Sequence, residues 1–493
     1  MSLSQKVLKG AVWSLIVSWI TRIIGIISTI ILVRVLAPED FGIAALATMV
    51  MLLFISLCEL GIRQYIIKSK DITNDLVNTA WSLQLIINLI IAILMIVFAP
   101  IVASFLDNHK LVDVLRVMAF IPIVTSLNNP GGILLAKKMD YATLSKVTIG
   151  AKLISAPATV FIALAYKSYW ALIFGQLISI ILTCLFSYIF ISYRPQFRKS
   201  NFSYIFTKTK WLLVSSLTGF VRAKIESLIV NIKYGAEGLG LYDISREFAH
   251  LPLSDVIGPA SAPLLSGVSS IETGMPEVYK AIVKYMYIAV FFLIPSIIGI
   301  FLVGDLFVKV VMGSQWLRAI PIFKSISALM IVFNLYTCCR TIMLLADDLR
   351  ILTILDICSI ALMFGLLLPS FIDSLEVLVI VRVLIGIIFG LFLLAILNIR
   401  YRLNLKPIIQ LFFTVPILCL PFSLVIYLIN PFLIAWGDPF ALFAMVAIGG
   451  ILYLGTLYAS ITFLAKINEY FLFTKELLDN LCKSCKKKVF TLI

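Results

Sequence analysis

The chain has 493 residues, of which 61% are hydrophobic and 13% are charged, and its formal net charge is +15. Its mean hydropathy is +1.09, and it contains apolar runs of about 20 residues, the length that crosses a bilayer as a helix. Together these features exclude a soluble globular fold. The residues between these runs are too few for a separate folded domain, and no nucleotide-binding, zinc-protease or serine-hydrolase motif is present. A pump with its own ATPase is therefore excluded.

The apolar runs predict an all-α integral membrane protein with about fourteen transmembrane helices. The first run is too long for a signal peptide, and no small-residue cleavage site follows it, so we expect it to remain a membrane helix. In chain order, the predicted spans cover residues 11–33, 41–62, 80–102, 115–136, 147–166, 169–191, 211–232, 241–265, 283–303, 319–345, 351–371, 377–398, 409–430 and 440–464.

The positive charge indicates topology rather than nucleic-acid binding. Most of the 40 Lys and Arg residues fall in one alternate set of predicted loops and tails. Because Lys and Arg are enriched in cytoplasmic loops, this distribution places both termini in the cytoplasm.

The chain also contains an internal repeat. Without gaps, the alignment pairs Trp13 with Trp211, Ser18 with Ser216, Ile31 with Ile229, Glu39 with Glu237, and Gly42 with Gly240. It predicts two pseudo-symmetric six-helix lobes of the same orientation, related by an axis along the membrane normal, as in many transporters. The predicted parts are an N-lobe at 1–191, a cytoplasmic linker at 192–210, a C-lobe at 211–398, a terminal pair of spans at 399–465 and a basic cytoplasmic tail at 466–493.

Arg22 lies in the middle of the first span, on a face that is rich in Ser and Thr. A charge at this depth costs roughly 2.5–3.5 kcal/mol or more, so it usually faces a cavity and binds something. Helix packing is the alternative explanation for the small residues, but it does not explain the arginine. We therefore expect Arg22 to bind an anionic substrate.

Spans seven and eight carry further charges. Arg222 and Glu226 are four residues apart, which also fits an intrahelical ion pair, and Lys224 points about 200° away from Arg222. One of the two cations is expected to face the cavity, and the sequence does not say which. Arg246 is a further candidate, although neighbouring acids could neutralise it, and three prolines are expected to bend its span.

Three other in-span cations are candidate substrate ligands. Arg116 and Lys324 lie near outer span ends and match across the repeat, whereas Arg340 lies towards the inner half of its span. Two more in-span cations are outside this set, because Lys152 lies close enough to a span end to extend to the surface and Arg382 lies near an outer end.

Three acids are candidates for binding a coupling proton or sodium ion: Glu59, Asp255 and Asp356. A purely structural role is the favoured alternative for each. The run from Asn128 to Gly132, "NNPGG", should interrupt the fourth span as a hinge or a plain kink. Cys482 and Cys485 lack the further ligands that a zinc site needs, so we predict no metal and no cofactor.

Four segments resemble one family: "GAVWSLI" at 10–16, "LAPEDFGIAAL" at 36–46, "ELGIRQYIIKSKDIT" at 59–73 and "GSQWLRAIPIFK" at 313–324. They are similar to segments of bacterial polysaccharide-repeat-unit (Wzx-type) flippases of the MOP exporter superfamily. The resemblance implies a MOP/MATE-like fold in the bacterial inner membrane. It also implies a flippase that moves undecaprenyl-pyrophosphate-linked oligosaccharide repeat units to the outer leaflet by alternating access, for exopolysaccharide, O-antigen or capsule synthesis. The pathway's polymerase and chain-length machinery are implied partners.

Three alternatives remain open. A multidrug or cation antiporter of the same superfamily normally needs acids in its cavity, whereas the first span carries Arg22 and no acid. A peptidoglycan lipid-precursor flippase shares both the fold and the charge. A membrane-embedded polysaccharide polymerase or ligase normally needs a sizeable outer loop, which the chain lacks.

Overall fold

The structure is a computed structural model. It describes residues 3–58, 73–137, 140–198, 202–258, 274–346, 348–369, 372–466, 469–476 and 479. Every element in these ranges is a helix. The chain divides into two compact units, Met1–Asp243 and Ile244–Ile493. The predicted lobe boundaries at 191 and 211 stay a prediction.

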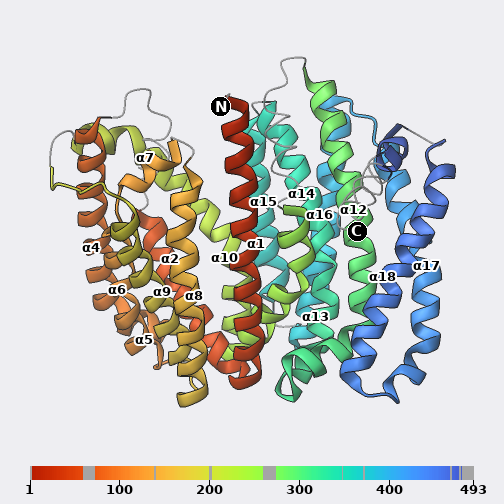
Figure 1. Cartoon of the computed structure of the whole chain (residues 1–493), viewed down its shortest axis with the longest axis horizontal. Helices are drawn as coiled ribbons and strands as arrows, with labels where there is room; N and C mark the ends of the chain where they lie inside the picture. The colour runs from red at the N-terminus through yellow and green to blue at the C-terminus, as the bar shows by residue number, and fades with distance from the viewer. Residues whose placement is uncertain are drawn as a thin grey trace, which may run out of the picture. The chain divides into compact units, whose positions relative to one another are not determined.

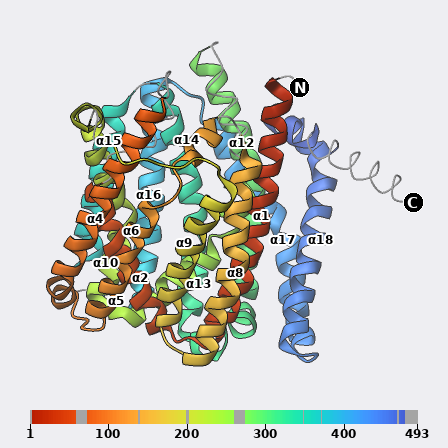
Figure 2. The same ribbon diagram turned by 60° about the vertical axis from the view of Figure 1, so that its left-hand side comes forward.

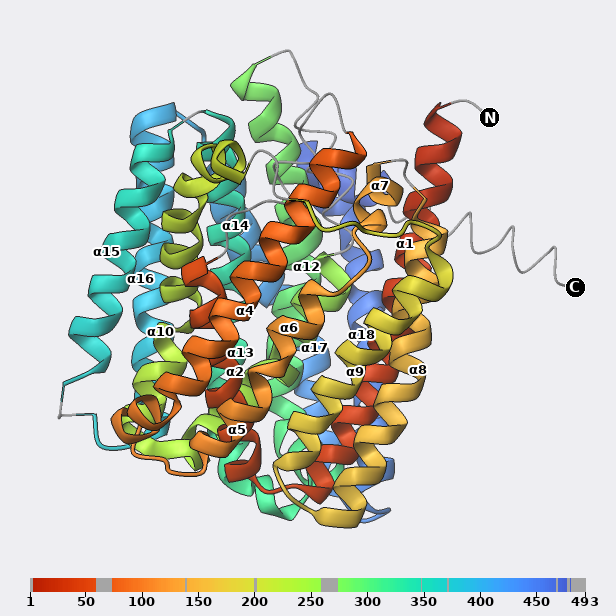
Figure 3. The same cartoon turned by 90° about the vertical axis from the view of Figure 1, so that its left-hand side faces the viewer.

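The first unit is a bundle of long helices (Figures 1 and 3). Helix α8 packs against both α9 and α1, and α4 packs against α5 and α6. The elements are α1 (Leu3–Val35), α2 (Pro38–Cys58), α4 (Asn74–Phe105), α5 (Leu111–Met118), α6 (Phe120–Ser126), α7 (Gly131–Lys137), α8 (Tyr141–Tyr166), α9 (Trp170–Phe190) and α10 (Phe202–Ala249), whose last residues belong to the second unit. Each of the predicted spans 1–3, 5 and 6 overlaps one of these helices.

Helix α10 consists of two arms that meet at Gly235. This glycine has φ 66° and ψ −169°, a backbone conformation that L residues with a side chain rarely adopt. The arms fold back on each other and are joined by two hydrogen bonds. The Tyr242 hydroxyl donates to Glu226 at 2.6 Å, and the Ser227 hydroxyl donates to Asp243 at 3.2 Å. Gly235 therefore separates the predicted seventh and eighth spans.

The predicted fourth span is broken, as "NNPGG" predicts. Helix α7 is bent by 58° relative to the segment Leu111–Ser126. The buried Asn129 side chain holds the break: its carbonyl oxygen accepts from the Gly131 N–H at 2.9 Å, and its amide donates to the Ile191 and Tyr193 carbonyls at 3.2 and 2.7 Å. The break is thus fastened to the chain that follows α9.

Gly131 leaves no room for a side chain at this break. A Cβ added there would lie 2.5 Å from Tyr193 Cβ and 2.9 Å from Ile191 Cγ2, whereas at Gly132 the nearest atom would be 3.5 Å away. We expect Gly131→Ala to destabilise the protein by about 1–3 kcal/mol, the usual cost of overpacking. Gly132→Ala is the matched control, and thermal unfolding in detergent measures both variants. Equal midpoints for the two variants would contradict this account of the break.

The second unit is built around α12 (Met275–Phe307), which packs against α14, α17 and α18 (Figures 1 and 2). Hydrogen bonds join α12 to its neighbours: the Tyr453 hydroxyl donates to the Phe291 carbonyl at 2.6 Å, and the Tyr287 hydroxyl to the Pro407 carbonyl at 2.9 Å. The other elements are η1 (Pro252–Ile257), η2 (Val308–Met312), η3 (Ser314–Ala319), α13 (Ile320–Ser327), α14 (Leu329–Leu345), α15 (Leu349–Leu367), α16 (Leu375–Tyr401), α17 (Lys406–Ile434) and α18 (Asp438–Leu464).

The surface of α17 shows why the chain needs a lipid environment. Phe413, Ile417, Leu420 and Leu424 are each at least 60% exposed and recur every three or four residues, so they form one apolar face. The described residues include nine helices long and apolar enough to cross a membrane, or ten when the bent pair in the fourth span counts as one. The prediction of an all-α, multi-pass membrane protein is confirmed, whereas the predicted number of fourteen spans is not confirmed.

Candidate functional site

Two cations of the first unit, both within predicted spans, lie on neighbouring helices. Arg22 on α1 is half-buried. Gly25 follows it by three residues and so lies on the same face of α1. A Cβ at Gly25 would lie 4.0 Å from Cε of Lys152 on α8, which is also half-buried. The packing of α8 on α1 therefore brings Lys152 to the face of α1 that carries Arg22.

Lys152 was not among the candidate ligands, because its position near a span end suggested that it extends to the surface. A signal was present in the sequence: Gly25, without a side chain, leaves room on the Arg22 face for a long neighbour. Two cations on adjacent spans attract an anion more strongly than one, and Arg offers bidentate hydrogen bonds to phosphate oxygens.

The other candidates in the first unit have different surroundings. Arg222 and Lys224 are half-buried on the first arm of α10. Glu226, only 6% exposed, accepts its hydrogen bond from Tyr242 on the second arm. Arg116 on α5 has an exposed side chain, 3.7 Å from Asp113. Such an exposed pair contributes little stability.

In the second unit, Arg340 forms a three-residue cluster with Tyr336 and Asp356. The Arg340 guanidinium lies 3.3 Å from an Asp356 oxygen and donates to the Tyr336 hydroxyl at 3.0 Å, and that hydroxyl donates to Asp356 at 2.5 Å. The side chains of Arg340 and Asp356 are 42% and 23% exposed, so the pair remains accessible. The structure thus joins a predicted anion ligand on α14 to a predicted coupling acid on α15.

The remaining candidates of this unit lie on other elements. The Lys324 ammonium lies 2.7 Å from Asp305 of α12, and Arg246 is half-buried at the end of α10. Asp255 lies in the π-helical turn η1, where it accepts a 3.1 Å hydrogen bond from Ser254. Glu59 lies outside the described residues.

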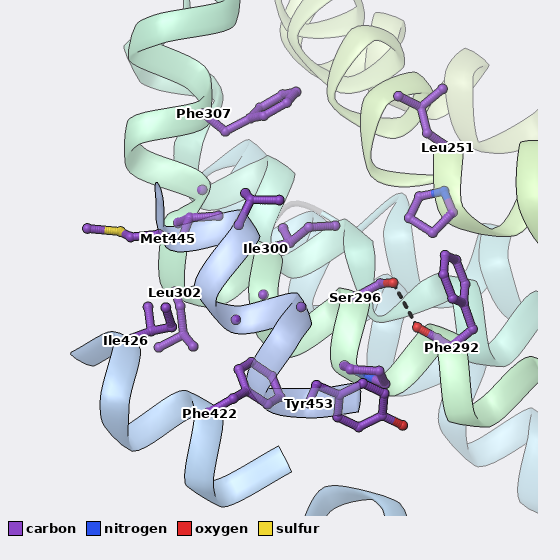
Figure 4. A pocket seen from close by; sticks show the side chains of 18 of the residues that line it. Leu251, Phe292, Ser296, Ile300, Leu302, Phe307, Phe422, Ile426, Met445 and Tyr453 are labelled. Atoms are coloured by element: carbon purple, nitrogen blue, oxygen red, sulfur yellow. Dashed lines mark hydrogen bonds between the residues drawn. The ribbon is translucent and has the colours of Figure 1, made fainter. Parts of the chain in front are cut away.

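An apolar cavity of about 530 Å³ opens in the second unit. Figure 4 shows Ile300 and Phe307 of α12, Phe422 and Ile426 of α17, and Tyr453 of α18 around it. Its lining has no charged side chain, and the Ser296 hydroxyl donates to the Phe292 carbonyl of its own helix at 2.7 Å. The cavity therefore suits a hydrocarbon chain rather than a charged group.

This cavity was not predicted from the sequence, because the residues of its apolar lining are indistinguishable in sequence from those of a lipid-facing helix surface. Glycines were the available signal. A Cβ at Gly299 or Gly450, both in the lining, would meet nothing within 4 Å, so these positions widen the space.

The described residues include no group of three or more His, Cys, Asp or Glu side chains arranged to hold a metal ion. Cys482 and Cys485 lie outside the described residues.

The long apolar helices define the chain as a multi-pass membrane protein. The family described as "Polysaccharide biosynthesis protein" matches residues 31–321. The chain belongs to this family, which confirms the family predicted from its motifs.

Two relatives and one solved structure extend this result. The chain is 24% identical over 326 residues to an "Uncharacterized membrane protein in cps region" of Klebsiella pneumoniae, covering 65% of this chain and 67% of the relative. It is 22% identical over 328 residues to the "Lipopolysaccharide biosynthesis protein WzxC" of Escherichia coli (strain K12), covering 66% and 67%.

The structure is similar to that of the lipid II flippase MurJ in an inward closed conformation. The TM-score is 0.72 at 15% sequence identity, over 92% of this chain and 99% of the MurJ chain. At this identity the likeness concerns the fold alone. It confirms the predicted MOP-type fold class.

Proposed function

We propose that the chain is a flippase for undecaprenyl-pyrophosphate-linked oligosaccharide repeat units in the bacterial inner membrane. The observation that carries this proposal is the juxtaposition of Arg22 and Lys152 on adjacent spans, in a member of a polysaccharide biosynthesis family. The similarity to WzxC supports the pathway, and the likeness to MurJ supports a fold suited to a lipid-linked substrate. The protein acts as a carrier and not as an enzyme.

The head group is the part of the substrate that the hydrocarbon layer opposes most strongly. A pyrophosphate must lose water to cross, and paired cations within the spans replace part of that hydration with charge-assisted hydrogen bonds. Arg22 and Lys152 bind the phosphates in the first unit. Arg222 or Lys224 and Arg246 are further proposed contacts.

The polyisoprenoid chain of the substrate is apolar and does not require polar surroundings. It stays in the bilayer, which already offers it apolar surroundings. Only the head group and the glycan then need polar surroundings inside the protein, because burying a polar group without hydrogen-bond partners is costly.

Transport follows alternating access, with both termini in the cytoplasm and export towards the outer leaflet. Coupling to H⁺ or Na⁺ through Glu59, Asp255 or Asp356 is part of this proposal, as is delivery of the product to the pathway's polymerase and chain-length machinery. A coupling ion acts as a co-substrate here, and no other cofactor is proposed.

Thermal stabilisation of the purified protein tests head-group recognition. A ligand that binds only the folded state and is present at a concentration of 100 times its Kd stabilises that state by about 2.7 kcal/mol. We expect undecaprenyl pyrophosphate to raise the unfolding midpoint more than undecaprenyl phosphate, and undecaprenol to raise it least. An equal effect of all three lipids would show that the pyrophosphate is not recognised.

A peptidoglycan precursor is the second candidate substrate, favoured by the likeness to MurJ. The same measurement with lipid II beside a lipid-linked oligosaccharide distinguishes the two, since both share the pyrophosphate. Stronger stabilisation by lipid II would favour this second candidate.

A further inference from the structure

The start of α2 and the second arm of α10 touch backbone against backbone. A Cβ added at Gly42 would lie 1.7 Å from the carbonyl oxygen of Ala236, and one added at Gly240 would lie 1.8 Å from the carbonyl oxygen of Pro38. Real Cβ atoms do not approach backbone oxygens so closely. Neither glycine can therefore gain a side chain unless the two helices move apart.

The contact is reciprocal in a way that follows the sequence repeat. The shift that aligns Trp13 with Trp211 also aligns Gly42 with Gly240 and Pro38 with Ala236. Gly42 faces the carbonyl of Ala236, and Gly240 faces the carbonyl of Pro38. Pro38 and Ala236 occupy equivalent positions in the two repeats. The two repeats meet here through equivalent atoms, as they would on a local twofold axis.

The start of α2 is held firmly on its own side. Asp40 accepts hydrogen bonds from the Ala37 N–H at 3.0 Å and from the Tyr169 N–H, at the start of α9, at 2.9 Å. Glu39 forms a 2.8 Å ion pair with Lys110, and its carboxylate raises the pKa of that lysine. The "PEDFG" segment (residues 38–42) is thereby fixed to two turns of the first repeat, those that contain Lys110 and Tyr169.

The chemistry of the contact suits an interface that opens and closes. It is made by Cα–H groups facing carbonyl oxygens, contacts that contribute about 0.5–1 kcal/mol each. Two such contacts are weak enough to break during a transport cycle. Because Gly42 and Gly240 have no side chains, no rotamer has to repack when the surfaces separate and meet again.

We propose that the Gly42–Gly240 contact is a reversible gate that closes the end of the protein predicted to lie outside. It is closed in this structure and parts when the substrate is released to the outer leaflet. This proposal rests on the alternating access of the proposed function. It assigns the "PEDFG" segment a role in conformational change rather than in substrate binding.

Spin labels at His109→Cys and Glu237→Cys report on the gate, because both residues are exposed and belong to opposite repeats near the contact. The labels are introduced into a variant whose native cysteines are replaced and whose transport activity is first shown to be retained. We expect one short distance without substrate and a second, longer population in proteoliposomes supplied with lipid-linked oligosaccharide. A single short distance under both conditions would show a permanent contact and overturn the proposal.

Alanine substitutions supply the second test. Gly42→Ala and Gly240→Ala should each shift the distances to the long population without substrate and lower transport at least tenfold. Gly219→Ala is the matched control on the same helix, because a Cβ there meets nothing within 4 Å. Distances and transport unchanged by Gly42→Ala would contradict the gate. If the alanine variants do not fold, the gate is tested by the spin-label distances with and without substrate in the protein that retains Gly42 and Gly240.

These outcomes separate the gate from the proposed function. Transport of lipid-linked sugar with a single fixed distance would leave the function standing and remove the gate. Two distance populations in a protein that flips no such lipid would leave the gate standing and remove the proposed function.

Discussion

Replacing Arg22 by alanine is expected to reduce the flipping of lipid-linked oligosaccharide by about 10- to 100-fold. Hydrogen bonds to charged groups contribute about 1.5–3 kcal/mol, and each 1.4 kcal/mol corresponds to a factor of ten. Arg22→Lys keeps the charge but loses the bidentate geometry, so it should fall between the wild type and Arg22→Ala. Initial rates of flipping in proteoliposomes measure all three proteins.

Lys152 and Arg116 provide the comparison for this prediction. Lys152→Ala should also reduce flipping, because its side chain reaches the Arg22 face of α1 at Gly25. Arg116→Ala should have little effect, since that side chain is exposed beside Asp113. A loss of flipping in Arg116→Ala that equals the loss in Arg22→Ala would contradict this placement of the site.

Replacing Arg340 by methionine is expected to destabilise the protein by about 1–3 kcal/mol. The change leaves the half-buried Asp356 carboxylate without its guanidinium partner, and removing the partner of a half-buried charge is costly. Asp356→Asn should cost less, because an amide still bonds to the Tyr336 hydroxyl. Thermal unfolding of both variants in detergent gives the two effects.

The double variant Arg340→Met, Asp356→Asn shows whether the two residues act together. It should be more stable than Arg340→Met alone, with a coupling energy within the 0.5–3 kcal/mol usual for contacting pairs. Strict additivity of the two single effects would mean that the ion pair does not hold α14 to α15. In transport assays, flipping by Asp356→Asn that still responds to an ion gradient would remove Asp356 as a coupling residue.

Local features of the structure were predictable from the sequence. The broken fourth span follows from Pro130 and its glycine neighbours, because proline removes a backbone donor wherever it lies in a helix. The membrane-spanning character follows from hydropathy, which depends on the composition of each run alone. The family follows from short motifs, including the "PEDFG" segment, whose residues bind neighbouring turns.

Features made by distant residues were not predictable in the same way. The approach of Lys152 to Gly25 depends on how α8 packs on α1, and the pairing of Lys324 with Asp305 depends on how α13 packs on α12. The repeat matched Gly42 with Gly240, but equivalence in a repeat does not imply contact. These facts required the tertiary structure, whereas the roles of the candidate ligands stay predictions.

Flipping of a defined lipid by the purified protein tests the central proposal most directly. Proteoliposomes would carry undecaprenyl-pyrophosphate oligosaccharide in one leaflet, and a membrane-impermeant lectin or enzyme would report its arrival in the other. The proposed function predicts protein-dependent crossing that Arg22→Ala suppresses while the variant stays folded. Absence of crossing with a cognate glycan, together with ion-coupled efflux of a cationic dye, would contradict it and favour a drug exporter.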